Sequence, residues 1–393
     1  MNAQQSKGKI AIIINIPAPY RIALFKSLSE TEDFKFKFFF CAPSEANRRW
    51  EAEEYLFDFE VLSGFSPTLR KKDGDVITLH INPSILYKLR GFDIIICAGY
   101  NYPTALLSLC YSLFFKIPLL LWTEQTLYTE ASHSFLLHTI RNMAKMFMLK
   151  GARGFIATGT QTKEFLIKHG VNKENIFLSP DAVDTEFFLH NSIKLEKEKE
   201  MLKKRLNLNL EKLIVYVGQL IERKGIIHLL QAYQRIFSDF NSIGLLIIGE
   251  GVQEEELKRY CQNHNLQNVF FLGYKSQEIL IQYLVISNLF VLPTLADVWG
   301  LVINEAMACG LPIVTTKQAA ASTDLVHDDK NGYVVDAEDI DGLTIAIKQI
   351  LQNPEKEQQM KIASREIIKN WGINEAVEGF LKAIRYTLYG EKR

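Results

Sequence analysis

Short apolar runs rich in β-branched and aromatic residues alternate with helical segments along almost the whole chain, and they do so in two series. Strands with this composition are typical of parallel sheets, because helical crossovers cover both faces and leave few strand positions in water. A charged segment, residues 194–205, separates the two series. The sequence therefore predicts an α/β chain with two doubly wound parallel sheets, one in each half.

The expected strands of the first series lie at residues 10–16, 34–41, 93–98, 118–122 and 154–158, and those of the second at 213–218, 244–249, 269–272, 289–293, 312–315 and 332–335. A chain of 393 residues exceeds the usual size of a single hydrophobic core. We therefore place one domain at residues 1–185 and a second at 186–372, with a C-terminal helix at about 373–390 that packs back on the first domain. Ligands of open α/β sheets bind beyond the carboxyl ends of the strands, so we expect a cleft between the domains.

Charge and cysteine content narrow the classes of function. The 45 Lys and Arg balance the 45 Asp and Glu, so a nucleic-acid binder that relies on bulk positive charge is not expected. The five cysteines are widely spaced in mostly apolar runs, which argues against a disulfide framework or a zinc cluster. The polar segment 1–9 does not resemble a signal peptide. Residues 105–122 contain Lys116 and Pro118, so we interpret them as a buried helix and a buried strand rather than a membrane span.

The first candidate site is the segment 215–225, in which a strand leads into a loop with two adjacent cations. Arg223 and Lys224 lie close to the start of the next helix, where partial positive charge disfavours cations unless an external anion is shared. Gly218 follows the strand and allows the close backbone approach that a phosphate needs. A solvated contact of both cations with Glu222 is the alternative interpretation.

The second candidate site is the segment 292–312, in which a strand, a loop and a helix beginning near Leu301 follow one another. Glu305 lies one turn inside the helix, on the same face as Leu301. The amides at the helix start can bind a diphosphate, Glu305 can accept hydrogen bonds from a ribose diol, and Asp297 in the loop can reach sugar hydroxyls. A carboxylate that only offsets the helix dipole is the alternative for Glu305. The spacing favours a nucleotide-sugar site.

These residues closely resemble family 4 of the retaining glycosyltransferases. Segment 292–312 is similar to the family's element Pro-Ser-x-x-Glu-Gly-Phe-Gly-Leu-x-x-x-Glu-Ala-Met-Ala-x-Gly-x-Pro. Segment 218–225 resembles its Gly-Arg-Leu-x-x-x-Lys-Gly element, and residues 249–251 read Gly-Glu-Gly after a buried strand. Residues 179–184 look like its interdomain junction, Pro-Asn-Gly-Val-Asp. The resemblance implies the GT-B fold, with two Rossmann-like domains that face a central cleft.

The resemblance also implies transfer of a hexosyl-type sugar from a UDP- or GDP-sugar to a glycan or lipid-linked acceptor, with no metal and no other cofactor. Arg223 and Lys224 would bind the diphosphate and Glu305 the ribose. Asp297 replaces the family's first Glu, which puts the donor-sugar selectivity in doubt, and no side chain is assigned as nucleophile. We expect Lys224→Ala to cut turnover strongly and to leave the thermal midpoint nearly unchanged. The expected donor-binding residues are Gly218, Arg223, Lys224, Gly249, Gly273, Tyr274, Asp297, Val298, Trp299, Gly300, Leu301, Val302 and Glu305.

The N-terminal half resembles the family less well, because the glycine pair of its first strand-to-helix loop is missing. Arg21 begins the helix after this loop and suits either an anionic ligand or an ion pair within the domain. Glu124 follows the strand that ends at Trp122 and can act as an acceptor base, as a charge that stabilises the transition state, or as a helix N-cap. His133 and His138 are weaker candidates. We assign Pro19, Arg21 and Tyr100 to the acceptor side, and Glu124, Asp297, Arg223 and Lys224 to catalysis.

The stretch 133–173 is basic, with seven Lys or Arg against the single acid Glu164. Its first half, residues 135–150, mixes basic residues with Phe, Leu and Met, which is typical of a helix that contacts anionic lipid. A core helix with solvated basic positions is the alternative. The family resemblance implies a cytoplasmic protein of surface-polysaccharide or glycolipid synthesis. Peripheral contact of this stretch with the inner face of the cell membrane is compatible with that setting, and both interpretations of the stretch stay open.

Other functions fit the same fold. A sugar-nucleotide 2-epimerase or hydrolase would act on the donor without an acceptor, and a non-catalytic protein could keep the nucleotide-sugar site. The Asp297 to Glu305 element argues against the first of these, and the non-catalytic alternative stays open. A dinucleotide-dependent oxidoreductase needs a glycine fingerprint after an early strand, and residues 15–21 do not supply it.

Overall fold

The computed structural model describes residues 8–45, 55–70, 76–129, 135–240 and 242–390, and the chain divides into two compact units. Unit 1 consists of Met1–Ala182 and Ile373–Arg393, and unit 2 of Val183–Gly372. The division falls within residues 179–184, the segment that resembles an interdomain junction, and close to the boundary expected between residues 185 and 186.

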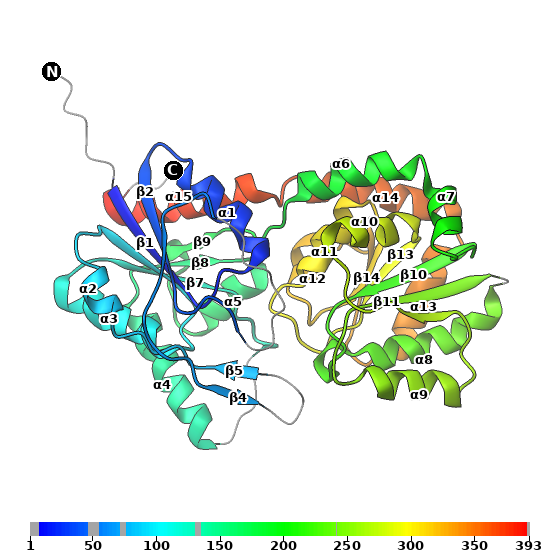
Figure 1. Ribbon diagram of the computed structural model, residues 1–393, viewed down its shortest axis with the longest axis horizontal. Coiled ribbons are helices and arrows are strands. Elements are labelled where there is room, and N and C mark those ends of the chain that lie inside the picture. Colours follow the sequence, from blue (N-terminus) through cyan, green and yellow to red (C-terminus); the bar gives the residue numbers. More distant parts are fainter. Residues whose placement is uncertain (1–7, 46–54, 71–75, 130–134, 241, 391–393) are drawn as a thin grey trace. The chain divides into compact units, whose positions relative to one another are not determined.

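Unit 1 contains, in its described residues, a parallel seven-stranded sheet with the strand order β3-β2-β1-β6-β7-β8-β9 (Figure 1). The strands are β1 (Gly8–Ile14), β2 (Phe34–Phe40), β3 (Phe59–Val61), β6 (Ile94–Ala98), β7 (Leu119–Thr123), β8 (Gly154–Ala157) and β9 (Ile176–Leu178), and a separate antiparallel pair is formed by β4 (Thr68–Arg70) and β5 (Val76–Thr78). All five strands expected from the sequence are present. The strands that it missed have three residues each, which is too short for a recognisable pattern.

Helices cover both faces of this sheet, namely α1 (Pro19–Ser29), α2 (Ile85–Lys88), α3 (Pro103–Phe115), α4 (Phe135–Gly151), α5 (Thr160–Lys168) and α15 (Ile373–Tyr389). Successive residues of β1 point to opposite faces. Ile12 packs in the layer that contains α1 and α15, whereas Ile13 packs in the layer that contains α2 to α5. The C-terminal helix α15 is thus part of the unit 1 core, where the Phe380 ring lies edge-on to Trp122 with 5.0 Å between the ring centroids.

Residues 105–122 form α3 and β7, but the expectation of a buried helix is wrong for the end of α3. Strand β7 is buried along its whole length. In contrast, Leu113, Phe114 and Phe115 in the last turn of α3 are 49%, 80% and 55% exposed. In the part of the chain that the structure describes, no helix is both long and apolar enough to cross a membrane.

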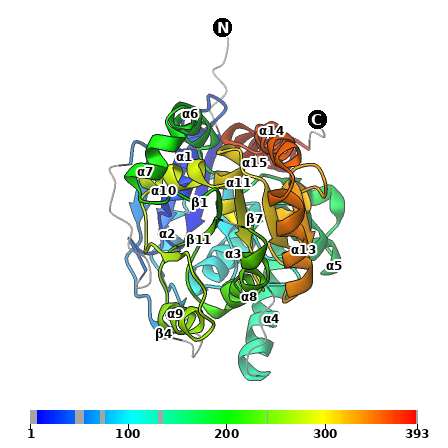
Figure 2. The ribbon, with the colours of Figure 1, turned by 90° about the vertical axis from the view of Figure 1, so that its right-hand side faces the viewer.

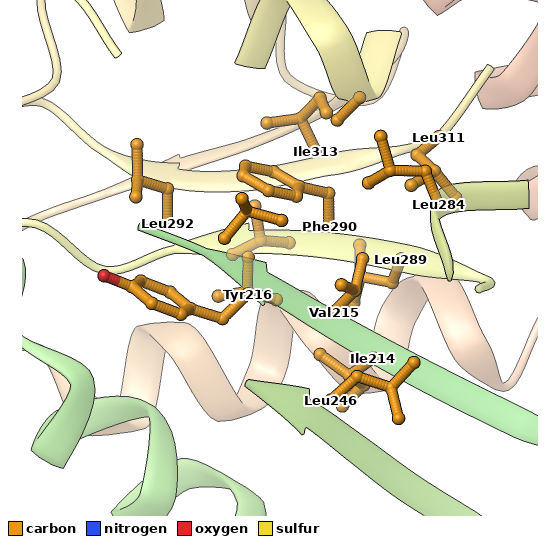
Figure 3. Packing of buried hydrophobic residues seen from close by; sticks show 14 of the residues in the cluster. Ile214, Val215, Tyr216, Leu246, Leu284, Leu289, Phe290, Leu292, Leu311 and Ile313 are labelled. Atoms are coloured by element: carbon orange, nitrogen blue, oxygen red, sulfur yellow. The ribbon is translucent and has the colours of Figure 1, made fainter. Parts of the chain in front are cut away.

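Unit 2 contains, among the described residues, a parallel six-stranded sheet with the order β12-β11-β10-β13-β14-β15. All six strands lie where the sequence predicts them, at β10 (Lys212–Val217), β11 (Ile243–Ile248), β12 (Val269–Phe271), β13 (Leu289–Leu292), β14 (Ile313–Thr316) and β15 (Gly332–Val335). Apolar side chains from neighbouring strands, such as Val215, Leu246 and Phe290, pack together in one large core (Figure 3). The expected α/β class with two Rossmann-like domains is confirmed.

The helices in the described part of unit 2 are α6 (Thr185–Glu196), α7 (Lys199–Arg205), α8 (Ile226–Ile236), α9 (Glu254–Asn263), α10 (Gln277–Ile286), α11 (Leu301–Ala308), α12 (Ala321–Leu325), α13 (Ile340–Leu351) and α14 (Pro354–Ile368) (Figure 1 and Figure 2). Short 3-10 turns lie at Lys173–Asn175 in unit 1 and at Glu222–Lys224 and Phe237–Asp239 in unit 2. The charged segment 194–205 is therefore mostly helical, in α6 and α7. Leu202 anchors α7 in the core, so this segment belongs to unit 2 rather than to a linker.

The strand order reverses direction between β1 and β6 in unit 1 and between β10 and β13 in unit 2. Such reversals open a crevice at the carboxyl edge of a doubly wound sheet, and ligands bind there because the loops on either side diverge. In unit 2 the segments that follow β10 and β13 are the two candidate sites of the sequence analysis. In unit 1 the segments that follow β1 and β6 carry Pro19, Arg21 and Tyr100. The topology therefore places the candidates of each unit at its own strand reversal.

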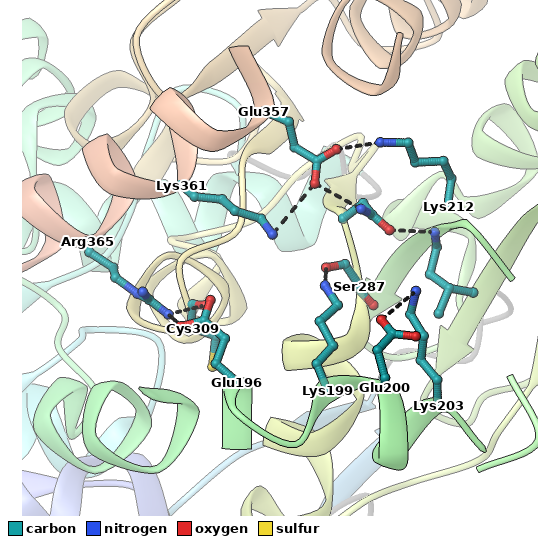
Figure 4. A network of polar contacts seen from close by, with 12 residues as sticks. Glu196, Lys199, Glu200, Lys203, Lys212, Ser287, Cys309, Glu357, Lys361 and Arg365 are labelled. Atoms are coloured by element: carbon teal, nitrogen blue, oxygen red, sulfur yellow. Dashed lines mark hydrogen bonds and ion pairs between the residues drawn. The ribbon is translucent and has the colours of Figure 1, made fainter. Parts of the chain in front are cut away.

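A polar network lies at the opposite, amino edge of the unit 2 sheet (Figure 4). Glu357 accepts hydrogen bonds from Lys212 at 2.8 Å and from Asn288 at 2.9 Å. These contacts outweigh burial and hold the pKa of Glu357 below its ordinary value. Lys199 donates to the Ser287 carbonyl at 3.2 Å, and burial, with Lys361 nearby, lowers the pKa of its ammonium to about 7. Lys199 is thus a cation of this network that loses its proton easily.

The lowered pKa of Lys199 predicts how Lys199→Met changes stability with pH. Between pH 7 and the ordinary lysine pKa, the unfolded chain binds a proton that the folded chain does not, so the wild-type free energy of unfolding rises with pH in this window. Lys199→Met removes the cost of burying the charge. We expect it to stabilise the protein by about 2 kcal/mol at pH 7 and by progressively less towards pH 10. Urea unfolding across this range measures the difference, and the exposed Lys194→Met is the matched control. A pH-independent difference would contradict the assignment.

Candidate active site

The loops that follow β10 and β13 are joined by backbone contacts. The Arg223 carbonyl accepts hydrogen bonds from the Leu295 amide at 2.8 Å and from the Thr294 hydroxyl at 2.9 Å. Gly225 has a φ of +64°, and a Cβ there would lie 2.2 Å from the Pro293 carbonyl oxygen, so only glycine permits this approach. The two candidate sites of the sequence therefore form one continuous surface.

The basic pair lies in the 3-10 turn before α8 rather than in the first turn of α8 itself. Arg223 donates to the Ala296 carbonyl at 3.2 Å and is half-buried. Lys224 is buried and forms an ion pair with Asp297, whose carboxylate is also buried. The carboxylate partner of Lys224 is thus Asp297 of the second loop, and not Glu222 as in the alternative that the sequence left open. A charge-assisted hydrogen bond between buried groups holds the two loops together.

Backbone hydrogen bonds also hold Asp297 in place. Its amide donates to the Gln318 carbonyl at 3.0 Å, and its carbonyl accepts from the Ala320 amide at 3.3 Å. Residues 317–320 follow β14, so Asp297 is held between the loops of three neighbouring strands. This rigid placement suits a carboxylate that must keep one position near a substrate.

Three glycines lie at the carboxyl ends of adjacent strands, Gly218 after β10, Gly249 after β11 and Gly273 near the end of β12. All three have positive φ values. The Gly249 amide donates to the Gly273 carbonyl at 3.0 Å, and a Cβ on Gly249 would lie 1.8 Å from the Gly218 carbonyl oxygen. Side chains are excluded here, so the backbone itself forms this part of the carboxyl edge. Tyr274 follows with 63% of its surface exposed, which leaves its ring available for stacking on a base.

The N-terminus of α11 faces the same carboxyl edge. Gly300 precedes the helix with a φ of +97°, and no side chain caps the helix amides, whose first turn contains Leu301 and Val302 and no acid. Uncapped amides and the helix dipole favour an anion at this point. Trp299 is 1% exposed, with its indole N–H donating to Asn304 at 3.0 Å, so its ring supports the loop from within the core, whereas Val298 beside it is half-buried.

Glu305 lies one turn further along α11 and is half-buried. Among the described residues, no hydrogen-bond donor or cation is assigned to its carboxylate. Burial therefore raises the pKa of Glu305 to about 8. A carboxyl group held without a protein partner next to uncapped helix amides is suited to receive hydroxyl donors from a ligand.

In unit 1, Arg21 and Glu124 form an ion pair at the carboxyl edge of the sheet. The guanidinium also lies over the Trp122 ring, 4.5 Å from its centroid, and both side chains are largely buried. This supports the interpretation of Arg21 as a residue paired within its domain. The helix N-cap alternative for Glu124 is wrong, because the next helix in the described residues, α4, begins at Phe135.

The other candidates of unit 1 have different surroundings. Pro19 is the first residue of α1, and Tyr100 is 5% exposed, so its ring packs in the core beside the reversal. His138 lies within α4, and nothing is described of its side chain. His133 lies outside the described residues.

A second polar cluster at the carboxyl edge of unit 1 was missed by the sequence analysis. His80 is buried. Its Nε2 lies 3.0 Å from the Glu45 carboxylate, and its Nδ1 lies 2.8 Å from the Ser66 hydroxyl. Glu45 also accepts from Asn15, in the loop after β1, at 3.2 Å. These residues are far apart in the sequence, and no spacing signals their contact.

Tyr216 of β10 was also missed. Its hydroxyl donates to the Gln219 carbonyl at 2.9 Å beneath the loop that carries Arg223. Burial, with Asp297 adding to it, raises the pKa of this phenol well above its ordinary value, so it stays a neutral donor. A tyrosine inside an apolar strand gives no sequence signal that distinguishes it from other core residues. In the described parts of both units, no three His, Cys, Asp or Glu side chains converge as metal ligands would.

Comparison with known proteins assigns this site to a family. Residues 197–367 match the profile of the family described as glycosyl transferases group 1, and this range contains both loops of the site. These residues are a group 1 glycosyl transferase domain.

Curated glycosyltransferases are similar to part of this chain. A GDP-mannose-dependent alpha-(1-6)-phosphatidylinositol monomannoside mannosyltransferase of Mycolicibacterium smegmatis is 29% identical over 202 residues, which are 49% of this chain and 51% of the relative. The capsular polysaccharide biosynthesis glycosyltransferase CapM of Staphylococcus aureus is 27% identical over 258 residues, 64% of this chain and 66% of the relative. The chain thus spans about half to two thirds of the length of these two relatives.

The fold of the whole chain is similar to that of GT-B glycosyltransferases. The crystal structure of HepE from Anabaena in complex with UDP superposes with a TM-score of 0.74 and covers 96% of this chain and 99% of that chain. The sequence identity is 17%, so this likeness concerns the fold alone.

The buried pair of the glycosyl transferase domain changes the expectation for Lys224→Ala. Removing the ammonium leaves the Asp297 carboxylate buried without its cation, so we now expect a loss of about 3–5 kcal/mol in the free energy of unfolding. The unchanged thermal midpoint expected from the sequence did not take this buried ion pair into account. Urea unfolding followed by tryptophan fluorescence, to which the stacked pair Trp299 and Trp371 contributes, measures the loss.

Two variants complete this test. The double variant Lys224→Met/Asp297→Asn removes both charges and should recover most of the lost stability. Arg223→Ala, which loses only a half-buried contact with a carbonyl, should cost about 1 kcal/mol. Equal losses in Lys224→Ala and in the double variant would show that the pair does not stabilise the domain.

Proposed function

We propose that this protein is a retaining glycosyltransferase of family 4 that transfers a hexosyl-type sugar from a UDP- or GDP-sugar to a glycan or lipid-linked acceptor. We place it in the synthesis of a surface polysaccharide or glycolipid, in the cytoplasm and at the inner face of the cell membrane. The names of the relatives support this setting, since one includes GDP-mannose and a phosphatidylinositol mannoside and another capsular polysaccharide biosynthesis. HepE, which has a similar fold, was crystallised with UDP.

The observation that carries the proposal is the convergence of positive charge at the strand reversal of unit 2. Arg223 and Lys224 are bound to the loop that leads into α11, and the uncapped amides of α11 follow that loop. An ammonium has three N–H donors, so Lys224 can bind Asp297 and a phosphate oxygen at once. A diphosphate at this point would receive charge from both cations and from the helix N-terminus, and its ribose would lie one turn away at Glu305.

The chemistry that we propose is stabilisation of the leaving group. When the bond between the sugar C1 and the diphosphate oxygen breaks, negative charge collects on the diphosphate, where Arg223, Lys224 and the α11 amides are fixed in advance. The acceptor hydroxyl attacks C1 on the face that the leaving group departs from, and its proton passes to a phosphate oxygen of the donor. The protein supplies no nucleophile and no metal in this scheme. Asp297 orients the sugar hydroxyls in this scheme.

A panel of UDP-, GDP- and ADP-sugars tests the donor site by thermal stabilisation of the pure protein. We expect one nucleotide family to raise the midpoint, equally with and without EDTA, because ligand binding to the folded state adds RT ln(1 + [L]/Kd) to its stability. Arg223→Ala should abolish most of the shift, since it removes a phosphate contact at little cost to the fold. Absence of a shift with every donor, or a shift that EDTA removes, would contradict the proposal.

The same donor then separates the alternative functions. Transfer of labelled sugar to an acceptor extract supports a glycosyltransferase, with turnover lost in Arg223→Ala. Release of nucleotide without transfer would indicate an epimerase or hydrolase, and binding without turnover a non-catalytic protein.

The raised pKa of Glu305 predicts a pH dependence of donor binding. Ribose hydroxyls donate hydrogen bonds, so the ionised carboxylate binds them better than the neutral acid does. Below pH 8 the site must lose a proton before it binds tightly. We expect donor affinity to rise between pH 6 and 8, by at most about tenfold per pH unit, and to level off above pH 8. Calorimetric titration with UDP- or GDP-sugar, whose phosphates do not titrate in this range, measures the profile. Glu305→Gln should give a flat one, and a pH-dependent Gln variant would assign the titration to another group.

A further inference from the structure

Helix α3 has an unusual surface for a helix that covers a Rossmann-like sheet. None of its 13 residues is charged. Its inner side packs on the sheet through Ala105 and Leu109, while Leu113, Phe114 and Phe115 at its end are exposed and Leu106 is half-buried. A helix that is apolar all round normally lies inside a protein or in contact with lipid. The outward side of α3 is therefore adapted to an apolar environment.

Helix α4 lies next to α3 and continues this surface. A Cβ at Gly151 would lie 2.8 Å from Leu109, so the two helices pack closely at this point. Phe147 lies one turn before Gly151 on the same side of α4, and it is 44% exposed. Met143, a further turn back, is 68% exposed, and Met146 beside it is 37% exposed. We call Leu113, Phe114, Phe115, Met143, Met146 and Phe147 the α3–α4 apolar surface.

Cations lie at one border of the α3–α4 apolar surface. Lys116, Lys150 and Arg153 are exposed. Lys116 follows the end of α3, Lys150 lies in the last turn of α4, and Arg153 follows the end of α4. The Arg153 amide donates to the Leu119 carbonyl at 2.8 Å, which holds the segment after α4 alongside the segment after α3. The sequence contains no acid between Asp93 and Glu124, and none between Glu130 and Glu164. The surface therefore combines exposed apolar residues with positive charge and no negative charge from either helix.

We propose that the α3–α4 apolar surface of unit 1 docks on an anionic lipid bilayer, with Leu113, Phe114 and Phe115 inserted among the acyl chains and Lys116, Lys150 and Arg153 at the phosphate level. Apolar insertion combined with basic side chains at the headgroups is how interfacial helices bind anionic membranes. At 13 residues α3 is about 20 Å long, too short to span a bilayer, so it lies along the surface. This inference deepens the proposed function, since it rests on a lipid-linked acceptor as the reason for the surface.

A second copy of the chain is the other occupant of an apolar surface. Protein interfaces of standard size carry about ten direct hydrogen bonds. The outward side of α3 presents Leu, Cys and Phe side chains, which cannot form the hydrogen bonds that such an interface contains. The basic border would also face itself across a two-fold axis, where like charges repel. Both features favour a bilayer.

Vesicle sedimentation of the full chain tests the proposal. We expect it to bind vesicles of phosphatidylcholine with about 30% phosphatidylglycerol at low salt, and to bind more weakly to phosphatidylcholine alone. Leu113→Glu/Phe114→Glu should lower the affinity at least about tenfold, because it replaces two inserted apolar side chains with charges. Ile167→Glu/Leu56→Glu adds the same charge at exposed positions of unit 1 outside the surface, and should bind like the wild type.

A fluorescent label on Cys110 gives an independent readout. All five cysteines fall in the described residues, and Cys110 on α3 is the exposed one. A polarity-sensitive dye there should shift to the blue when anionic vesicles are added. No shift, or a wild-type protein that stays in the supernatant at low salt, overturns the proposal. So does equal binding by the α3 variant.

Sedimentation velocity tests whether a second copy of the chain covers the α3–α4 apolar surface. A wild-type dimer that Leu113→Glu/Phe114→Glu dissociates would assign the surface to a second copy and overturn the lipid proposal. Circular dichroism and the donor-induced thermal shift of the same variants show that the fold and unit 2 are intact. A missing donor shift in the wild type contradicts the proposed function, whereas missing vesicle binding contradicts only the membrane surface.

Discussion

The candidate site depends on the contact between two loops that lie on either side of one strand reversal. An open parallel sheet with right-handed crossovers has helices on both faces only if its strand order reverses, and the loops diverge at that reversal. In unit 2 the loops do not simply diverge. The Arg223 carbonyl, the absence of a side chain at Gly225 and the ion pair between Lys224 and Asp297 tie them into one surface. The helix N-terminus and Glu305 take their positions from that surface.

The ion pair between Lys224 and Asp297 has a cost in stability and a benefit in geometry. A buried charge pair is costly to desolvate, and a pair of apolar residues would often be as stable. Its value here is geometric, because it fixes a cation and a carboxylate next to uncapped helix amides in a site that is otherwise built from glycines and apolar side chains. Arg223 is less buried, and it contributes positive charge without forming a buried ion pair that holds the two loops together. The two adjacent cations are thus not equivalent, although they look alike in the sequence.

Much of the fold could be predicted because parallel strands need long apolar runs, which is how all eleven expected strands were found. The loops of unit 2 could be predicted because phosphate and ribose recognition requires glycines, cations and carboxylates at fixed spacing. The partnership of Lys224 with Asp297 could not, since it joins residues 73 positions apart. The cluster of Glu45 with His80 and the pairing of Arg21 with Glu124 were missed for the same reason. The sequence analysis wrongly predicted that α3 is buried throughout, because a buried helix and a helix with an exposed apolar side have the same apolar sequence pattern.

The position of α15 has a consequence for how the chain folds as it is synthesised. One face of the unit 1 sheet is covered by α1 and by α15, which follows unit 2 in the sequence. Trp122 and the strands around it therefore keep apolar surface open until residues 373–384 have left the ribosome. Unit 2 lies between the two parts of unit 1 and has all its strands and helices available earlier. The order of completion is thus inverted relative to the sequence, and the N-terminal unit is the one that waits, with its exposed sheet face as the point most open to aggregation or to a chaperone.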